Sequence, residues 1–470
     1  MNFEQKQNIG FIFVLDKLCP QSGFGKKAVK KITPFTCQQD LEEEFDNLQT
    51  LVQVLQGDTR AFDALNGTLA HVKDVHSTLS HIGDDLHEIE LFELKNYCFC
   101  CDAIANHLQK LSVNLKNLSL KPLKEAYRLL NKSESSGFYL SDDYSEQLAL
   151  VRKKKREVTQ KMISATGEQK ETFQRQHLLL ATEEENIEFD LRKQLSQQLL
   201  PYKQDALANA EVLTRIDLLV QKAILAHKEN CPRPVFSQEK FEITHAVNPL
   251  VSHQLNQQGK QFTPLSLTLK GCTVITGANM GGKTIALKTV ALNAYAVSCG
   301  FFPFAKSMTV PFLSFVEILS EDLQSSQRGL SSFGGEIVKI NQLFLQAKNS
   351  RGLLLIDEFA GGTNSEEGAK IFSALILALK DTPSFALLTT HFDGVCYLAD
   401  ERYQIVGLSQ ESKQKLRNRA RLSTKEVTQE EVSQYMDYGL VKTDKSQQIP
   451  KDAIDICIIL GLNEDIIKRL

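Results

Sequence analysis

The sequence predicts an α/β domain built on a parallel sheet, preceded by a domain made of helices. Three observations support this. Proline and glycine are rare between residues 40 and 230, where apolar residues recur at helical spacing. Residues 352–356 and 385–388 are continuous apolar runs, as expected for parallel strands buried on both faces. A third apolar run, residues 272–275, passes directly into a glycine-rich loop and then into a helical pattern.

The length and composition fit a large protein with more than one domain. A chain of 470 residues exceeds one ordinary domain, 42% hydrophobic residues suffice for a sizeable core, and a net charge of −3 does not single out nucleic acid as a partner. The first residues lack the pattern of a signal peptide, and no apolar stretch is long enough to span a bilayer. We therefore expect a soluble, cytoplasmic protein without a membrane partner.

Residues 39–52 carry the clearest helical pattern of the first half, with apolar residues on one face of an amphipathic helix. Cys98, Cys100 and Cys101 lie in a second helical pattern. Clustered thiolates could share a metal, but no second Cys or His pair at zinc-site spacing accompanies them, so we interpret them as core residues. We interpret the ten cysteines of the chain as reduced thiols and not as a disulfide framework.

Two basic stretches could contact the phosphates of a nucleic acid, because clustered Lys and Arg supply sequence-independent affinity. One is residues 152–156, and the other consists of Lys413, Lys415, Arg417, Arg419 and Arg421. Neither stretch is interleaved with aromatic residues that could stack bases. A solvated helix face is the alternative that we favour for both.

Residues 277–284 fill the pattern G-x-x-x-x-G-K-[ST] of a phosphate-binding loop, with the preceding strand and following helix that this pattern requires. Backbone N–H groups of the loop would point at phosphate oxygens, Lys283 would reach the β- and γ-phosphates, and the Thr284 hydroxyl would complete a Mg²⁺ shell. The predicted nucleotide-binding residues are Gly277, Asn279, Met280, Gly281, Gly282, Lys283 and Thr284.

Two strand ends downstream supply groups suited to phosphoryl transfer. We expect Asp357 to hold Mg²⁺ through water and Glu358 to orient the attacking water as a general base. A strand that merely ends in an acidic turn is the alternative. His391 closes the next apolar run, where it could sense the γ-phosphate. A histidine at a strand end is usually structural, but the order of the elements favours a functional role.

Together these motifs resemble the MutS family of ABC-type ATPases, in four segments that follow the family's order: residues 276–284, 331–333, 357–364 and 389–392. The resemblance implies an α/β P-loop (ABC-type) ATPase domain, binding ATP and Mg²⁺, preceded by an all-α core and lever domain. It implies that Ser331 of one subunit caps the γ-phosphate held by the other, so that the active unit is a dimer. It also implies that Phe262 stacks on adenine, although a core phenylalanine before a strand is the alternative.

The catalytic residues under this interpretation are Glu358, His391, Lys283 and Ser331, with Thr284 and Asp357 at the metal. The sequence departs from the family pattern in two places. Ala278 stands where a proline is usual, and residues 359–362 lack an arginine found at the family's dimer interface. Neither change removes a catalytic group, so we expect ATP hydrolysis.

The same resemblance suggests the domain boundaries. We expect a helical core and shortened lever over residues 1–235, the ATPase domain over 236–420 and a helical dimerisation segment over 421–470. Residues 141–152 and 183–225 look like the outgoing and returning lever helices, and Asn248 stands in place of a histidine at the entry to the ATPase. Only residues 166–180 are left for the clamp that closes around DNA, which we expect to be deleted, and we expect the mismatch-reading and connector domains to be lacking too.

Two functions remain open. The family default is a dimeric DNA-binding ATPase of mismatch repair or recombination control, formed with itself or with a related MutS-like chain. The alternative is a protein-remodelling ATPase that resembles the reactivating factor of adenosylcobalamin-dependent lysine 5,6-aminomutase. Loss of the clamp and near-neutral charge favour the second function, which would make a cobalamin-dependent aminomutase the partner, whereas family frequency favours the first.

Overall fold

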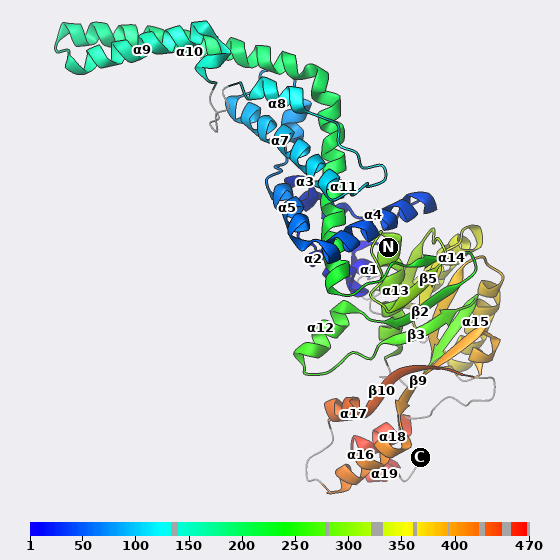
Figure 1. Cartoon of the computed structure of the whole chain (residues 1–470). Helices are drawn as coiled ribbons and strands as arrows, with labels where there is room; N and C mark the ends of the chain where they lie inside the picture. Colours follow the sequence, from blue (N-terminus) through cyan, green and yellow to red (C-terminus); the bar gives the residue numbers. More distant parts are fainter. Residues whose placement is uncertain are drawn as a thin grey trace. The chain divides into compact units, whose positions relative to one another are not determined.

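The structure is a computed structural model of the chain that describes residues 1–132, 140–277, 282–320, 332–360, 364–392, 394–422, 428–443 and 453–467. It consists of two compact units (Figure 1). Unit 1 comprises Met1–Lys17, Thr33–Phe45 and Leu225–Leu470. Unit 2 comprises Leu18–Ile32 and Asp46–Ile224. In the described parts of both units, no helix combines the length and apolar character needed to cross a membrane.

Every regular element described in unit 2 is a helix, as the sequence predicts. The helices that lie within it are α3 (Gly23–Ala28), η1 (Val29–Lys31), α5 (Thr59–Ala70), α6 (His76–Ser80), α7 (Glu88–Lys110), α8 (Lys124–Leu130), η2 (Asp142–Tyr144), α9 (Glu146–Ser164), α10 (Glu168–Leu199) and η3 (Leu200–Tyr202). Two further helices begin in one unit and end in the other, α4 (Gln38–Gly57) and α11 (Lys203–Lys228). The predicted apolar face of α4 is buried, which confirms the amphipathic pattern.

The helices α9 and α10 form an antiparallel hairpin (Figure 1). They are joined by residues 165–167, where Gly167 adopts a positive φ of 60°. No domain is inserted between them within the described residues 140–277. The residues left for a clamp, 166–180, therefore fall mostly in the first turns of α10. Pro201, in η3, ends α10 and separates it from α11 because proline cannot continue the hydrogen bonding of a helix interior.

The three clustered cysteines of α7 are buried in the core of unit 2, as interpreted from the sequence. Burial raises the pKa of the Cys98 thiol to about 12 and that of Cys100 to about 11. A thiol must lose its proton to bind a metal, so these groups are poor ligands at neutral pH. None of the ten cysteines forms a disulfide, and the described residues hold no group of three or more potential metal ligands.

Unit 1 contains two β-sheets in its described part. The smaller one has the strand order β1 (Val235–Phe236), β5 (Ser307–Val310), β2 (Phe241–Ala246), β3 (Leu265–Leu269). The larger one has the order β10 (Met436–Lys442), β9 (Glu401–Leu408), β4 (Cys272–Thr276), β8 (Phe385–Thr390), β7 (Leu353–Ile356), β6 (Val316–Leu319). All neighbours in the larger sheet are parallel except β10 and β9.

The helices of unit 1 are α1 (Phe3–Asn8), α2 (Phe11–Asp16), α12 (Pro249–Gln257), α13 (Lys283–Ser298), α14 (Ser332–Asn349), α15 (Ser365–Lys380), η5 (Val395–Leu398), α16 (Gln410–Leu422), α17 (Gln429–Tyr435), α18 (Ala453–Ile459) and α19 (Glu464–Ile467). Helix α13 follows β4, and most of its residues are buried. This helix is apolar on every side because it lies within the core of the unit.

The strands β4, β7 and β8 are the predicted apolar runs, and every one of their residues is buried. They are neighbours in the order β4, β8, β7 and run in parallel, so their carboxyl ends meet at one edge of the sheet. Ligands of open parallel sheets bind at this edge. The topology therefore gathers the loop after β4, the carboxylates after β7 and the histidine after β8.

The N-terminal residues belong to unit 1, which differs from the expected helical domain over residues 1–235. The Phe11 ring packs edge-on against Tyr295 of α13 with centroids 4.9 Å apart, and Phe45 stacks on Phe236 at 5.7 Å. The Phe35 N–H donates to the Ser298 carbonyl at 2.8 Å. These contacts join residues far apart in sequence, so helical periodicity alone does not reveal them.

Candidate functional site

The predicted phosphate loop leads into the N-terminus of α13. Gly277 and Gly282 flank it with φ values of 150° and 89°. A Cβ atom on Gly282 would lie 3.1 Å from Tyr438 Cδ1, so this position combines a backbone that favours glycine with a close neighbour. The first N–H groups of a helix have no partners within the helix and attract anions. Asn279, Met280 and Gly281 lie outside the described residues.

Lys283, the first residue of α13, has only 4% of its side chain exposed and contacts two oxygens. Its Nζ lies 2.9 Å from Glu358 Oε1 and donates a hydrogen bond of 2.9 Å to the Gly277 carbonyl. Glu358 follows β7, and β8 lies between β7 and β4 in the sheet. The ion pair therefore joins two strand ends and brings together two of the predicted catalytic residues.

The Thr389 hydroxyl organises the two carboxylates after β7. Its Oγ1 donates to Asp357 Oδ1 at 2.5 Å and accepts the Glu358 N–H at 3.0 Å. Glu358 itself has a φ of 45°, which is unusual for a residue with a side chain. Such a conformation persists only where its surroundings hold it, and strained residues of this kind cluster at functional sites. The backbone therefore turns the Glu358 side chain toward Lys283.

His391 follows β8 and also reaches Glu358. Its Nδ1 lies 3.7 Å from Glu358 Oε2, and 39% of its side chain is exposed. The ring packs beside Phe392 with centroids 4.5 Å apart. Glu358 thus lies between Lys283 on one carboxylate oxygen and His391 on the other.

A second buried carboxylate supports the strand end. Glu336, on the first turns of α14, accepts the Ala360 N–H through Oε2 at 3.3 Å. Ala360 has a φ of 64°, so the backbone after β7 adopts an uncommon conformation at a second residue besides Glu358. This bond ties α14 to the segment that carries Asp357 and Glu358. Ser331, predicted to act in the partner's site, lies just before α14 and outside the described residues.

The groups near the strand ends suit Mg²⁺ in their chemistry. Thr284 is half-buried at the second position of α13, and Asp357 is nearly buried after β7. Hydroxyl and carboxylate oxygens are hard ligands, and Mg²⁺ is usually held by one or two such groups together with water and substrate phosphates. The donor set therefore fits the predicted metal residues, which would need a phosphate-bearing substrate to complete the site.

A cavity of about 410 Å³ opens beside the start of α13. Phe262, in the segment before β3, lines it together with Gly282 and Ile285. Tyr438 and Leu440 of β10 also line it. Phe262 is half-buried against this space and does not belong to the buried core, which is the placement expected of a residue that stacks on a ligand. A cavity of this size accommodates a small organic ligand.

Sequence reasoning missed the residues that support the site from outside the motifs. Thr389 precedes His391 in a run of two threonines at the end of an apolar strand, and a hydroxyl at that place was a usable signal. Glu336 and Tyr438 gave no such signal. They reach the site only because α14 packs on β7 and because β10 pairs with β9.

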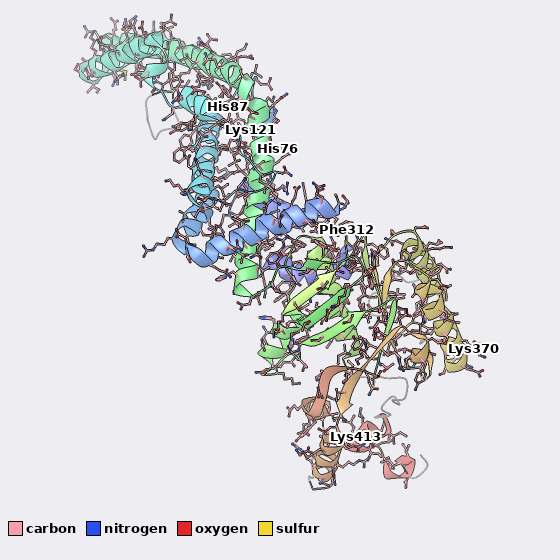
Figure 2. The ribbon with its side chains drawn as sticks, turned by 45° about the vertical axis from the view of Figure 1, so that its right-hand side comes forward. His76, His87, Lys121, Phe312, Lys370 and Lys413 are labelled. Carbon is pink, nitrogen blue, oxygen red and sulfur yellow. The ribbon has the colours of Figure 1, made fainter. Side chains whose placement is uncertain are left out.

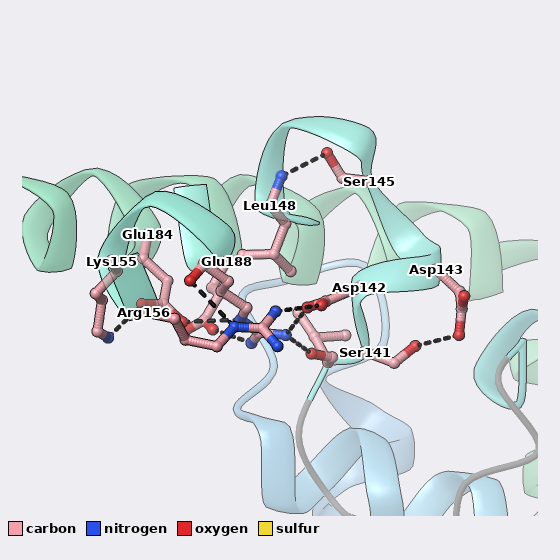
Figure 3. A network of polar contacts seen from close by, with 11 residues as sticks. Ser141, Asp142, Asp143, Ser145, Leu148, Lys155, Arg156, Glu184 and Glu188 are labelled. Carbon is pink, nitrogen blue, oxygen red and sulfur yellow. Dashed lines mark hydrogen bonds and ion pairs between the residues drawn. The ribbon is translucent and has the colours of Figure 1, made fainter. Parts of the chain in front are cut away.

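The first basic stretch is largely engaged in ion pairs (Figure 3). Arg152 contacts Asp142, Glu184 and Glu188 at 2.9, 2.8 and 2.6 Å. Lys155 also pairs with Glu184, and Arg156 pairs with Asp142. Burial alone would lower the pKa of Arg152, but its hydrogen bonds to the three carboxylates raise it above its ordinary value. Arg152 and Lys155 connect α9 to α10, and Arg152 and Arg156 connect α9 to Asp142 of η2.

The second basic stretch, on α16, is engaged in the same way. Lys413, labelled in Figure 2, lies 2.9 Å from Asp455 of α18, and Arg417 contacts the same carboxylate. Lys415 pairs with Glu411 within α16, and Arg419 pairs with Glu431 of α17. The side chain of Arg421 lies outside the described residues. Both stretches therefore carry salt bridges on helix faces that are partly open to solvent, in keeping with the solvated faces expected from the sequence, and Lys153 and Lys154 of the first stretch are exposed.

Comparison with known proteins places the site in a characterised domain. Residues 273–457 match the family model of MutS domain V. Proteins named Endonuclease MutS2 are similar to part of the chain. The one from Thermus thermophilus is 32% identical over 200 residues, which is 42% of this chain and 26% of that protein. Those from Lactobacillus gasseri and Pediococcus pentosaceus are 34% and 31% identical, over 46% and 47% of this chain and 27% and 28% of theirs. The chain thus spans about a quarter of the length of these relatives.

Proposed function

We propose, from the premise that the chain is a member of the MutS family through its domain V, that it is an ATP-binding and ATP-hydrolysing switch. The observation that carries this proposal is the buried ion pair between Lys283 and Glu358 at the carboxyl edge of the sheet. It unites a phosphate-binding lysine at a helix N-terminus with a carboxylate that could orient water. We assign the base of the nucleotide to the cavity beside the start of α13, which Gly282 and Phe262 line.

Phosphate binding would exchange the partner of Lys283. The lysine is buried, so its ammonium needs an anion or another acceptor nearby, and Glu358 and the Gly277 carbonyl fill that role. Triphosphate oxygens at the N-terminus of α13 would compete with Glu358 for Lys283. The N–H groups of the helix and the negative charge of the phosphates would favour the triphosphate in this competition. Glu358 would then be released from the lysine. Binding of the triphosphate would therefore also free the carboxylate of Glu358 for catalysis.

Once released, Glu358 remains oriented by its surroundings. Its N–H is fixed by Thr389, and His391 lies beside its second oxygen. Glu358 would accept a hydrogen bond from the attacking water, and His391 would contact the γ-phosphate, as the family resemblance implies. Mg²⁺, held by Thr284 and Asp357, would neutralise charge that develops on the phosphate oxygens. Thr389 keeps Asp357 in position for this role through its hydroxyl.

ATPase measurements on two variants test the proposal. Lys283→Ala should abolish ATP binding, because it removes the buried cation at the loop. Glu358→Gln should bind ATP at least as tightly as the wild type, since a neutral amide competes less for Lys283, while kcat falls roughly 100- to 10,000-fold. Lys370→Ala and Glu366→Gln are matched controls, because these side chains pair with each other on the exposed face of α15 and should leave both quantities unchanged. Undiminished hydrolysis by Glu358→Gln would refute the assignment of the base.

We further propose that two copies of the chain, or this chain and a related one, complete each other's sites through Ser331. A mixing experiment tests this. Ser331→Ala and Lys283→Ala should each be inactive alone. A mixed dimer would contain one site with an intact Lys283 from one chain and an intact Ser331 from the other, so activity should appear when the two variants are combined. Absence of any activity in verified mixed dimers would mean that Ser331 acts within its own chain.

The proposed target of the switch is DNA, following the family default, as in recombination control or mismatch repair. The relatives are named endonucleases, but this chain matches only about a quarter of them, so that name supports a nucleic-acid target without assigning cleavage here. The protein-remodelling alternative, with a cobalamin-dependent aminomutase as partner, gains support from two observations. No clamp domain is inserted between α9 and α10 in the described residues, and Arg152 and Lys155 already pair with carboxylates of α10.

A further inference from the structure

One face of β10 forms a wall of the cavity beside α13. Met436, Tyr438 and Leu440 all line it, although the pairing of β10 with β9 shifts register between Asp437 and Leu440. Tyr438 also lies against Gly282, as the 3.1 Å separation of its Cδ1 from an added Cβ demonstrates. The wall therefore adjoins the N-terminus of α13, where the proposed function puts the phosphates of ATP.

The same strand belongs to a small hydrophobic core formed by the last helices. This C-terminal cluster consists of buried Leu408, Leu416, Val432, Met436, Ile456 and Ile459. Met436 is a member of both the cavity wall and the cluster, and Tyr438 lines the cavity while packing against the cluster. In Figure 1, α16, α17, α18 and α19 gather beside the ribbon formed by β9 and β10. The cluster and the cavity thus have the side chains of Met436 and Tyr438 in common.

The connection between β9 and β10 brings this cluster to the sheet. The two strands are antiparallel neighbours, yet the chain between them forms α16 and α17 in place of a tight turn. Helix α18 packs on α16, and its Asp455 pairs with Lys413 and Arg417. The hydrogen bond from Lys413 is the main cause that holds the pKa of Asp455 below its ordinary value. A core this small responds strongly to any apolar area added at Met436 or Tyr438.

We propose, on the basis of the ATP site proposed above, that the C-terminal cluster senses the nucleotide base. A purine in the cavity packs against β10 and stabilises the cluster through Met436 and Tyr438. Because a coupling free energy is reciprocal, the packing of the cluster in turn sets the affinity for the base. Phosphates that are bound by the loop and by Lys283 do not contribute to this coupling. The helices α16, α17 and α18 therefore distinguish a bound nucleotide from a bound phosphate.

The first test measures hydrogen exchange in α16 and α18 of the full chain, with Mg²⁺ and either ADP or inorganic pyrophosphate at saturation. Both probes carry two phosphates and only ADP carries a base. We expect ADP to slow exchange in these helices by roughly fivefold or more and pyrophosphate to leave it unchanged. Equal protection by both probes, or protection by neither while both bind, would overturn the inference.

The second test measures affinity by calorimetry in two variants of the same helix. Ile459 is 1% exposed in the cluster and does not line the cavity, whereas Ile454 is 51% exposed. Ile459→Ala should weaken ADP binding by roughly fivefold or more and leave pyrophosphate binding unchanged. Ile454→Ala should leave both unchanged.

The outcomes separate the inference from the function on which it rests. If the wild type binds neither ADP nor pyrophosphate, the ATP site itself is refuted and the inference falls with it. If ADP binds and Ile459→Ala retains full ADP affinity, the ATP site stands and base sensing is refuted. Should Ile459→Ala fail to fold, the exchange measurement on the wild type still decides.

Discussion

At the scale of single residues, the site depends on the hydroxyl of Thr389, which is not itself predicted to contact ATP or Mg²⁺. Thr389 donates to Asp357 and accepts from the backbone of Glu358, so it orients both carboxylates after β7. Its removal would leave a buried carboxylate oxygen and a backbone N–H without this partner. Polar groups that lose a partner in a buried site cost about 1–3 kcal/mol each.

Thr389→Val, which keeps the shape and removes the hydroxyl, should therefore lower kcat for ATP hydrolysis about tenfold to hundredfold, the usual effect of losing a supporting hydrogen bond at such a site. KM for ATP should change less, because Lys283 and the loop are untouched. Thr389→Ser retains the hydroxyl and serves as the control, with activity close to the wild type. Steady-state ATPase kinetics give both parameters, and a Val variant as active as the Ser variant would argue against this role.

At the scale of elements, α3 packs against a buried carboxylate of α11. Asp217 accepts the Gln21 N–H at 3.1 Å and the Ser22 N–H at 2.8 Å, and the Ser22 hydroxyl also donates to it. Burial raises the pKa of Asp217 despite these donors. A Cβ on Gly25 would lie 2.2 Å from Asp217 Oδ2, so the helix can approach this closely only with glycine at that position.

Two Gly→Ala substitutions test the close contact between Gly25 and Asp217 against an open position on the surface of α5. Gly25→Ala should destabilise unit 2 by about 1–3 kcal/mol, the range for overpacking a fitted core. Gly67, inside α5, has no atom within 4 Å of an added Cβ, so Gly67→Ala should stabilise the helix by about 0.4–1 kcal/mol. Thermal unfolding should move the midpoint in opposite directions. A midpoint that rises for both variants would show that α3 does not need this close approach.

At the scale of the whole molecule, the choice between DNA and a protein target depends on how many cations remain for phosphates. Arg152 and Lys155 pair with carboxylates of α10, and Arg156 pairs with Asp142 of η2. Lys413 and Arg417 pair with Asp455. Each phosphate contact adds close to one unit to the slope of log affinity against log salt. The paired cations of both stretches should therefore contribute little to such a slope, whereas Lys153 and Lys154 of the first stretch are exposed.

We expect duplex DNA binding, measured from 50 to 200 mM salt, to show a shallow slope that Lys413→Ala and Arg152→Ala leave unchanged, apart from any loss of folding seen by circular dichroism. The proposed DNA target requires measurable binding and stimulation of the ATPase. A steep slope that either variant reduces would instead identify that stretch as a phosphate-binding surface. No binding at low salt would direct the search to protein partners.

The division between the units illustrates where sequence patterns reach their limit. Local periodicity correctly predicts α4, the core position of the cysteines in α7 and the buried strands β4, β7 and β8, because each pattern reflects the burial of one continuous segment. The family resemblance, by contrast, assigns the first helices to a helical domain over residues 1–235. Their placement in unit 1 depends on aromatic contacts such as Phe11 with Tyr295, which no local pattern encodes.

By itself, the sequence determined the loop at the start of α13, the order of the motifs and the residue types that phosphate and Mg²⁺ chemistry require. These are properties of short segments, which the residues within each segment suffice to specify. Only the tertiary structure decided that Lys283 meets Glu358, that Thr389 supports both carboxylates and that β10 closes the cavity beside Phe262. Each of these contacts joins separate segments, and the parallel order of the sheet, together with the pairing of β10 on β9, is the physical cause that brings them together.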